Sequence, residues 1–173
     1  EEIPMPDRFS RDNAYGTILL DWWQKLEDDR ASRAILRRAP TVTAVTLSAP
    51  YQRLYRRFKA AAWNADHISS RDDRLAAIVG LLAHVTQDQP GALAKAMSHK
   101  APGEDRPLVS ELRFTRLLES PDVESLFTGL RRVLPLMEHR IDVIALADDI
   151  LFWGDDRRKR WAYAYDWPES KSA

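Results

Sequence analysis

The 173-residue chain contains no cysteine. Disulfide bonds and thiolate metal sites are therefore excluded, which suits a reducing cytoplasm. No apolar run approaches the ~20 residues that a membrane-spanning helix requires. The segment from Glu1 to Asp12 is acidic and contains proline, so it lacks the pattern of a signal peptide. Together these absences predict a cytoplasmic protein that does not have a membrane as a partner.

The chain also lacks a net charge, because 26 Lys and Arg residues balance 26 Asp and Glu residues. A free-standing nucleic-acid-binding protein usually carries excess positive charge, so this balance argues mildly against one. The charges are unevenly distributed, however, since the segment from Arg30 to Ala65 has eight basic residues and no acidic residue. A neutral chain with this distribution can still present one strongly positive surface.

Strand signals are nearly absent, because the only β-branched run, Thr41 to Thr46, is short. Apolar residues recur instead at the helical period along most of the chain. The sequence therefore predicts an all-α fold, a helical bundle of about seven to nine helices in two packed lobes. The expected helices cover about residues 14–27, 31–38, 48–63, 70–85, 91–98, 109–119, 122–134, 141–153 and 155–165.

The strongest boundary signal is the loop-forming segment APGEDRP at residues 101–107. It predicts an N-terminal tail at 1–13, an N-terminal lobe at 14–100, the loop at 101–107, a C-terminal lobe at 108–167 and a tail at 168–173. Ser48 is the expected N-cap of its helix, with Pro50 in the first turn, and Ser120 is the expected N-cap of another.

The expected helix at 48–63 carries the most informative basic residues. Its apolar residues share one face, Arg53, Arg56 and Arg57 lie on the opposite face, and Lys59 lies at the margin. Arginine on such a face is often merely solvated. Here no carboxylate is close enough in the sequence to neutralise these arginines, so the stripe favours binding of phosphates.

Similar pairs of arginines recur on other expected helices. Each lies away from the apolar stripe of its own helix or at the end of that helix: Arg37 and Arg38, Arg113 and Arg116, and Arg131 and Arg132. Arg37 and Arg38 could instead serve the negative end of their helix dipole. The basic run Arg157 to Arg160 follows Asp155 and Asp156, so self-neutralisation is an equally good explanation there.

Residues that could carry catalysis do not form a convincing site. His84 and Asp88 have a helical spacing of four, but two ligands without a third make a poor metal site. Asp148, Asp149, Asp155 and Asp156 could be proposed as a two-metal nuclease site, but consecutive positions face different ways, so solvated helix faces are the better explanation. The sequence has no Gly-rich phosphate loop, nucleophile elbow or zinc-finger spacing. We therefore expect no catalytic residue, no metal site and no cofactor.

An ordered series of segments resembles the CasB family, the small subunit of the type I-E CRISPR surveillance complex Cascade. The resemblance covers about residues 14–167. The segments that carry it are LDWWQKL, RAILRRA, YQRLYRRF, GALAKAM, SELRFTRLL, LFTGLRRVLPLM, IDVIALADDILFWGDD and RRKRWAYAYDW.

The resemblance implies an all-α fold of two lobes that acts without catalysis. It implies that the partners are other Cascade subunits, a second copy of the chain, the CRISPR RNA and single-stranded segments of the target DNA. It further implies that a basic surface contacts the target and displaced strands of the R-loop. Matching to the family is best for Arg113, Arg116, Arg131 and Arg132, and next best for Arg37 and Arg38.

Two other functions remain open from the sequence. The arginines could meet acidic subunits, which would make the chain a scaffold that acts through protein contacts alone. The aspartates could form the metal-dependent nuclease site considered above. Salt-dependent binding to a bare oligonucleotide would separate the first alternative from nucleic-acid binding, and incubation of DNA with magnesium or manganese would test the second.

Overall fold

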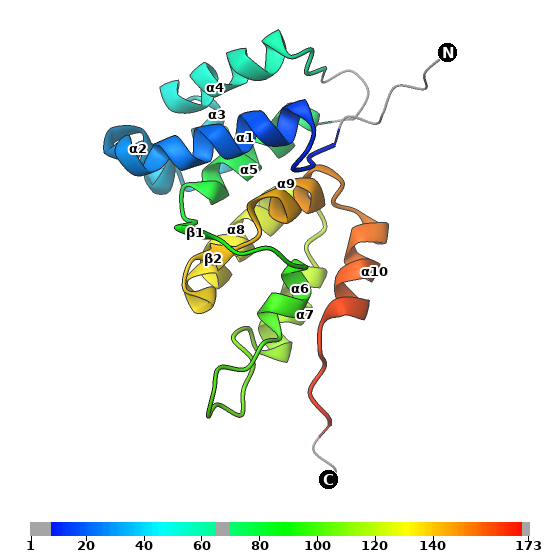
Figure 1. Ribbon diagram of the computed structural model, residues 1–173. Helices are drawn as coiled ribbons and strands as arrows, with labels where there is room; N and C mark the ends of the chain where they lie inside the picture. The colour runs from blue at the N-terminus through cyan, green and yellow to red at the C-terminus, as the bar shows by residue number, and fades with distance from the viewer. Residues whose placement is uncertain (1–7, 65–69, 171–173) are drawn as a thin grey trace.

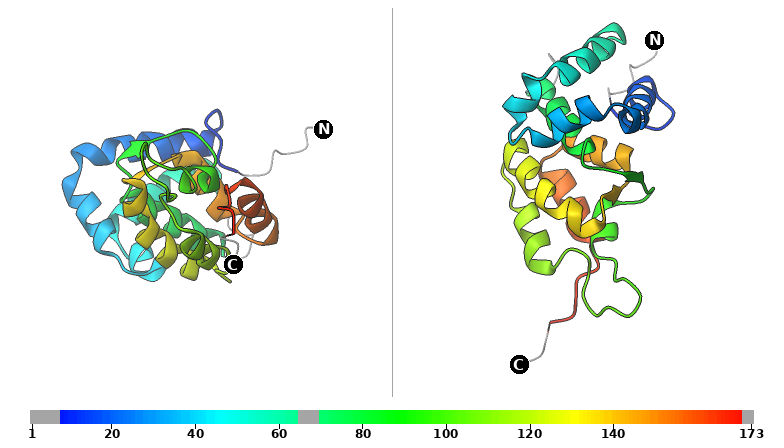
Figure 2. Two further views of the ribbon diagram at one scale, coloured as in Figure 1. Left: turned by 90° about the horizontal axis from the view of Figure 1, so that it is seen from below. Right: turned by 90° about the vertical axis from the view of Figure 1, so that its left-hand side faces the viewer.

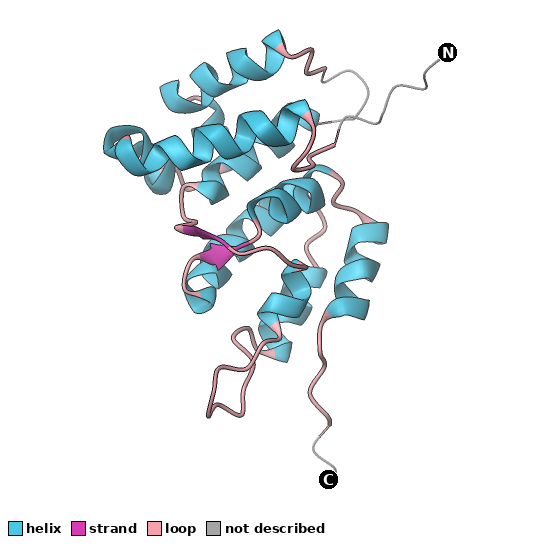
Figure 3. Cartoon of the chain, in the orientation of Figure 1, coloured by secondary structure: helices cyan, strands magenta, loops and turns pink. Residues whose placement is uncertain are grey.

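The computed structural model describes residues 8–64 and 70–170 and confirms an all-α fold (Figure 3). Within these residues the sequence forms ten α-helices, including one, α3, in the β-branched segment where no helix was expected. In chain order they are α1 (Ala14–Lys25), α2 (Arg30–Arg38), α3 (Val42–Thr46), α4 (Ala49–Ala60), α5 (Arg71–Leu82), α6 (Leu93–Met97), α7 (Glu111–Leu118), α8 (Val123–Val133), α9 (Val143–Leu151) and α10 (Asp155–Ala164). Two short 3-10 helices, η1 (Leu26–Asp28) and η3 (Leu134–Met137), extend α1 and α8.

Side-chain caps define where several helices begin. The hydroxyl of Ser48 accepts a hydrogen bond from the backbone N–H of Tyr51, as expected, with a proline in the first turn of α4. The expectation for Ser120 was wrong, because Asp122 caps α8 by accepting from the N–H of Ser125. Ser120 is instead buried, and its carbonyl accepts a hydrogen bond from the indole of Trp153.

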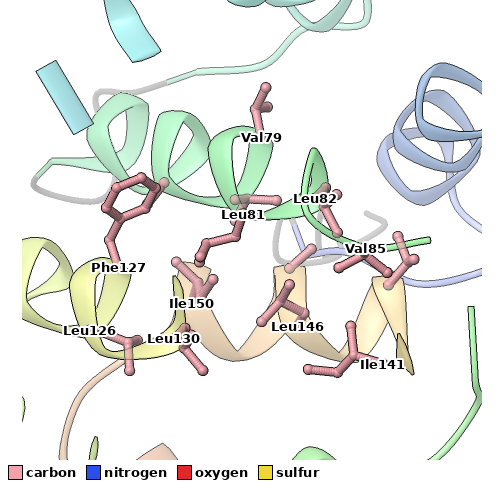
Figure 4. Packing of buried hydrophobic residues seen from close by; sticks show 14 of the residues in the cluster. Val79, Leu81, Leu82, Val85, Leu126, Phe127, Leu130, Ile141, Leu146 and Ile150 are labelled. Carbon is pink, nitrogen blue, oxygen red and sulfur yellow. The ribbon is translucent and has the colours of Figure 1, made fainter. Parts of the chain in front are cut away.

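Helix α5 lies at the centre of the molecule and is buried along nearly its whole length. It packs against α3, α8 and α9. Figure 4 shows the contact between apolar side chains of α5, α8 and α9. Gly80 lets α5 approach α3 and α8, since a Cβ at this position would lie 2.7 Å from Val45 Cγ2 and 2.9 Å from Phe127 Cε2.

The buried apolar residues form one connected core from Phe9 to Tyr165. Figure 1 shows α1, α2 and α4 above α5, and α6, α7 and α10 at the opposite end of the molecule. Residues 101–107 form a loop beside a β-bridge between Lys100 and Pro107. The predicted division into lobes at 14–100 and 108–167 stays a prediction, which limited proteolysis at this loop can test.

Two dipeptides pair as a short parallel sheet that joins the two halves of the chain. Strand β1 (Gln87–Asp88) follows α5, and β2 (Arg140–Ile141) precedes α9, with Gln87 opposite Arg140. The Asp88 carboxylate accepts hydrogen bonds from Arg11 and from the backbone N–H of Val143. Among the described residues, no helix is both long and apolar enough to cross a bilayer.

Candidate nucleic-acid interface

Helices α7 and α8 orient the arginines that match the family best. Helix α7 buries Phe114 and Leu117 in the core, and this orientation leaves Arg113 and Arg116 exposed on neighbouring turns. Helix α8 buries Leu126, Phe127, Leu130 and Val133, which leaves Arg132 exposed near its C-terminal end. The apolar stripe of each helix therefore determines where its arginines point.

The two helices bring Arg113, Arg116 and Arg132 together around one groove of about 600 Å³. Leu117 and Gly129 contribute to its lining. The close approach of α7 to α8 depends on Gly129, since a Cβ there would lie 2.8 Å from Leu117 Cδ2. The groove is thus a product of helix packing and joins arginines that lie 19 positions apart in the sequence (from 113 to 132).

The arginines of this groove are not neutralised by salt bridges in the described part of the chain. Two carboxylates, Glu119 and Glu124, also line the groove. Glu124 accepts a hydrogen bond from the backbone N–H of Val42 at 3.3 Å. Three guanidinium groups therefore face solvent in one groove, each able to bind a phosphate oxygen.

Arg37 and Arg131 meet at the junction of α2, α5 and α8. The Nε of Arg37 donates to the carbonyl oxygen of Ala83 at 2.8 Å, and Nη2 of Arg131 donates to the carbonyl oxygen of Arg37 at 3.2 Å. Burial, and then the neighbouring charge of Arg33, lower the pKa of Arg37. Arg38 is exposed and donates to the carbonyl oxygen of Ala34 in its own helix.

The basic residues of α4 form a separate group. Arg53, Arg56, Arg57 and Lys59 are all exposed, opposite the buried face of the helix. Arg57 is neutralised by Asp21 of α1, with Nη2 at 2.9 Å from Oδ2. Local sequence spacing had left this arginine without a partner, because the partner comes from another helix.

The candidate residues thus fall into three groups rather than one continuous contact. The right-hand view of Figure 2 shows the order of their helices down one side of the molecule, with α4 uppermost, then the α2–α3 region, then α8 and α7. Arg131 and Arg132 are consecutive in α8, so the C-terminal end of this helix joins the α2–α5–α8 junction to the groove.

The two aspartates of α9, Asp148 and Asp149, are both paired with Arg157. Asp148 is buried, and its carboxylate accepts hydrogen bonds from Arg157 and Arg8, each at 3.0 Å, and from the backbone N–H of Phe9 at 3.2 Å. Asp149 accepts from Arg157 at 2.8 Å. The expectation of solvated aspartates was therefore wrong for these two residues. In the described residues, no group of three His, Asp or Glu side chains could hold a metal ion.

The basic run at 157–160 is partly neutralised, but only Arg158 pairs with one of the two aspartates that precede the run, Asp155. Arg157 pairs with Asp148 and Asp149 of α9. Arg158 lies 3.4 Å from Asp155 and also donates to the carbonyl oxygen of Leu118. Lys159 and Arg160 remain exposed on α10. Arg157 and Arg158 therefore serve the packing of α10 against α9 and α7.

Sequence reasoning did not include two residues that lie beside Arg37 and Arg131. Arg33 precedes Arg37 by one helical turn, and its Nε lies 3.5 Å from the same carbonyl oxygen of Ala83. The helical spacing of four between the two arginines could have found it. His84, which follows α5, was considered only as an incomplete metal site with Asp88, because nothing local shows that α2 and α8 surround it.

A comparison with family models finds a match over residues 32–165 to the family described as CRISPR-associated protein Cse2. The matched range contains every arginine and lysine of the three groups. Searches of curated proteins and of solved structures return no match.

Proposed function

The chain belongs to the Cse2 (CasB) family of CRISPR-associated proteins, and we propose that, as a small subunit of the type I-E Cascade complex, it holds the DNA strands of the R-loop by their phosphates. Opening a DNA duplex releases a single strand whose phosphates repel their neighbours. Arginines that neutralise these phosphates make strand exchange more favourable, as protein contacts to the backbone do in other RNA-guided systems. The subunit acts without catalysis in this proposal.

The observation that carries the proposal is the groove between α7 and α8. Arg113, Arg116 and Arg132 reach it from two helices, and no carboxylate pairs with them among the described residues. Arginine binds phosphate oxygens through two parallel N–H groups and does so without reading base identity. The proposed partners are the target and displaced DNA strands, the CRISPR RNA, other Cascade subunits and a second copy of the chain.

The test is charge reversal in the assembled complex. We expect Arg113→Glu/Arg116→Glu/Arg132→Glu to lower the lifetime of the R-loop and to leave the helix content of the subunit unchanged. If each arginine contacts one phosphate of a single strand, the negative slope of log affinity against log salt becomes less steep by about 2. The matched control is Lys159→Glu, which reverses an exposed cation on α10. It should leave the lifetime of the R-loop and the salt slope unchanged.

A scaffold that works through protein contacts alone is the second candidate. The exposed side chains of Leu112, Tyr163 and Trp167, which are 60%, 91% and 40% accessible, favour a protein contact near the end of the molecule formed by α7 and α10. If the arginines also meet acidic subunits in such a contact, the triple variant fails to join the complex at all. If it assembles normally and holds the R-loop as long as the wild type does, nucleic-acid binding by the groove is wrong.

A further inference from the structure

Three arginines and a histidine converge at the C-terminal end of α5, beside the groove between α7 and α8. Arg33 and Arg37 come from successive turns of α2, Arg131 comes from α8, and His84 follows α5 directly. Arg33 and Arg37 both direct Nε to the carbonyl oxygen of Ala83. Arg131 donates to the carbonyl oxygen of Arg37. Charged side chains of one sign rarely gather in this way without a counter-charge.

Helix capping explains only part of this arrangement. The carbonyl groups at the end of a helix carry about half a negative charge, and here one of them anchors two guanidinium groups. The salt bridges of the described residues include none that involves these three arginines. Glu27 lines a small pocket that Arg33 also lines, and it forms no such pair. The positive charge of the cluster therefore exceeds what the backbone can balance.

The donors that remain on these arginines suit a phosphate. A guanidinium group has five N–H donors, of which contacts to backbone carbonyls use Nε of Arg33, Nε of Arg37 and one Nη of Arg131. The Nε of Arg131 is shielded from solvent and has no hydrogen-bond partner among the described residues. An anion with several oxygens, bound by the remaining donors of two guanidinium groups, would balance the charge.

His84 lies close enough to the three arginines for their charges to lower its pKa. Its Nε2 is shielded from solvent and has no hydrogen-bond partner in the described part of the chain. The charged groups that face it are Arg33 and Arg37 of α2, Arg131 of α8 and His139 between η3 and β2. His139 directs Nδ1 to the carbonyl oxygen of His84 at 2.9 Å. Burial, followed by the charges of Arg131 and Arg37, lowers the pKa of His84 to about 4.

We propose that Arg33, Arg37 and Arg131 bind one phosphodiester of a nucleic-acid strand, and that the bound phosphodiester makes His84 easier to protonate. The inference rests on the proposed function, because it adds a second contact for the same strand. A bound phosphate offsets the arginine charges that oppose protonation of His84. Because Arg131 and Arg132 are consecutive in α8, a strand that leaves the groove reaches this site at its next phosphates.

The experiment follows the imidazole nitrogens of His84 by NMR in the full chain. The pH is varied with thymidylyl-thymidine, which has one phosphodiester and no terminal phosphate, with inorganic phosphate, and with chloride at equal ionic strength. We expect thymidylyl-thymidine to raise the pKa of His84 by about one unit, the size of shift that a nearby opposite charge produces. In Arg131→Gln, which keeps a neutral side-chain NH2 group but removes the charge, the rise should be lost.

A second measurement at pH 7 keeps the test independent of acid stability. The ³¹P resonance of thymidylyl-thymidine should shift on adding the wild type and Lys159→Gln, and should not shift on adding Arg37→Gln/Arg131→Gln. An unchanged ³¹P resonance with the wild type overturns the site. If thymidylyl-thymidine leaves the pKa of His84 unchanged, the coupling between phosphodiester binding and His84 protonation is wrong. If only inorganic phosphate raises this pKa, the assignment of the site to a nucleic-acid strand is wrong.

The outcomes also separate this inference from the proposed function. One possible outcome is that the triple variant of the groove weakens the R-loop while phosphodiesters leave the pKa of His84 unchanged. The inference is then wrong, and the proposed function stands. If phosphodiesters raise the pKa of His84 while the groove variant holds the R-loop normally, the site is supported and the role of the groove fails.

Discussion

Removal of the Arg157 guanidinium should destabilise the fold strongly, although this residue belongs to a basic run that resembles a nucleic-acid contact. Its Nη1 donates to both Asp148 and Asp149, and the side chains of the three residues are only 11%, 6% and 17% exposed. Burial raises the pKa of Asp149, against hydrogen bonds from Trp161 and Arg157 that favour its charged form. Arg157 thus holds a pair of largely buried carboxylates together.

The magnitude follows from what Arg157→Met leaves behind. Breaking a buried ion pair by removing one partner costs about 3 to 5 kcal/mol. Arg8 still contacts Asp148 at 3.0 Å, so we expect the lower end, about 3 kcal/mol. With a urea m-value of about 2 kcal/mol/M, the unfolding midpoint should fall by about 1.5 M.

The assay is urea unfolding followed by tryptophan fluorescence and far-UV circular dichroism at pH 7. The matched control is Lys159→Met, an exposed cation on the same helix, whose free energy of unfolding should stay within about 0.5 kcal/mol of the wild type. The double variant Arg157→Met/Asp149→Asn should recover part of the loss, because it removes one buried charge. Equal midpoints for Arg157→Met and Lys159→Met would refute the reasoning.

Three further results are expected. Because the pKa of His84 falls from 6.5 to about 4 on folding, the unfolded chain binds more protons, so stability from His84 is present above pH 6.5 and lost toward pH 4. This loss is on the order of 3 kcal/mol, and urea midpoints of the wild type should fall relative to His84→Gln over that window. Gly80→Ala should destabilise the fold by about 1 kcal/mol. Crowding against Val45 and Phe127 costs about 1 to 3 kcal/mol, which outweighs a gain of about 1 kcal/mol in helix propensity. A higher thermal midpoint than that of the wild type would contradict this. The isolated chain should bind oligonucleotides with micromolar or weaker affinity, a steep salt dependence and no base preference. Nanomolar binding at physiological salt, or a strong difference in affinity between fixed and randomised sequences, would count against this prediction.

Helix positions and outward faces were predictable because both depend on residues close together in the sequence. The 3.6-residue period located nine of the ten α-helices within a few residues of their ends. The same period placed Arg113 and Arg116 on the exposed side of α7, where they lie. The missed helix, α3, is only five residues long and contains four β-branched residues, and its cap at Thr41 and its packing against α5 override that preference.

The family was also recognisable from the sequence, because the ordered series of helical segments spans most of the chain and the family model matches residues 32–165. The charge environment of each residue was not. Asp148 seemed a solvated residue of a helix, and Arg57 seemed to have no partner. Both conclusions considered only neighbours in the sequence, whereas the partners come from α10 and the N-terminal segment in one case and from α1 in the other.

The sequence by itself therefore determined the helices, their buried and exposed faces and the family of the protein. Only the tertiary structure decided which charges meet. It brings Arg113 and Arg116 of α7 to Arg132 of α8, and it surrounds His84 with arginines from α2 and α8. The physical reason is that helical periodicity is a property of contiguous residues, whereas electrostatic interactions depend on distances in space, which the packing of α5 against α3, α8 and α9 sets.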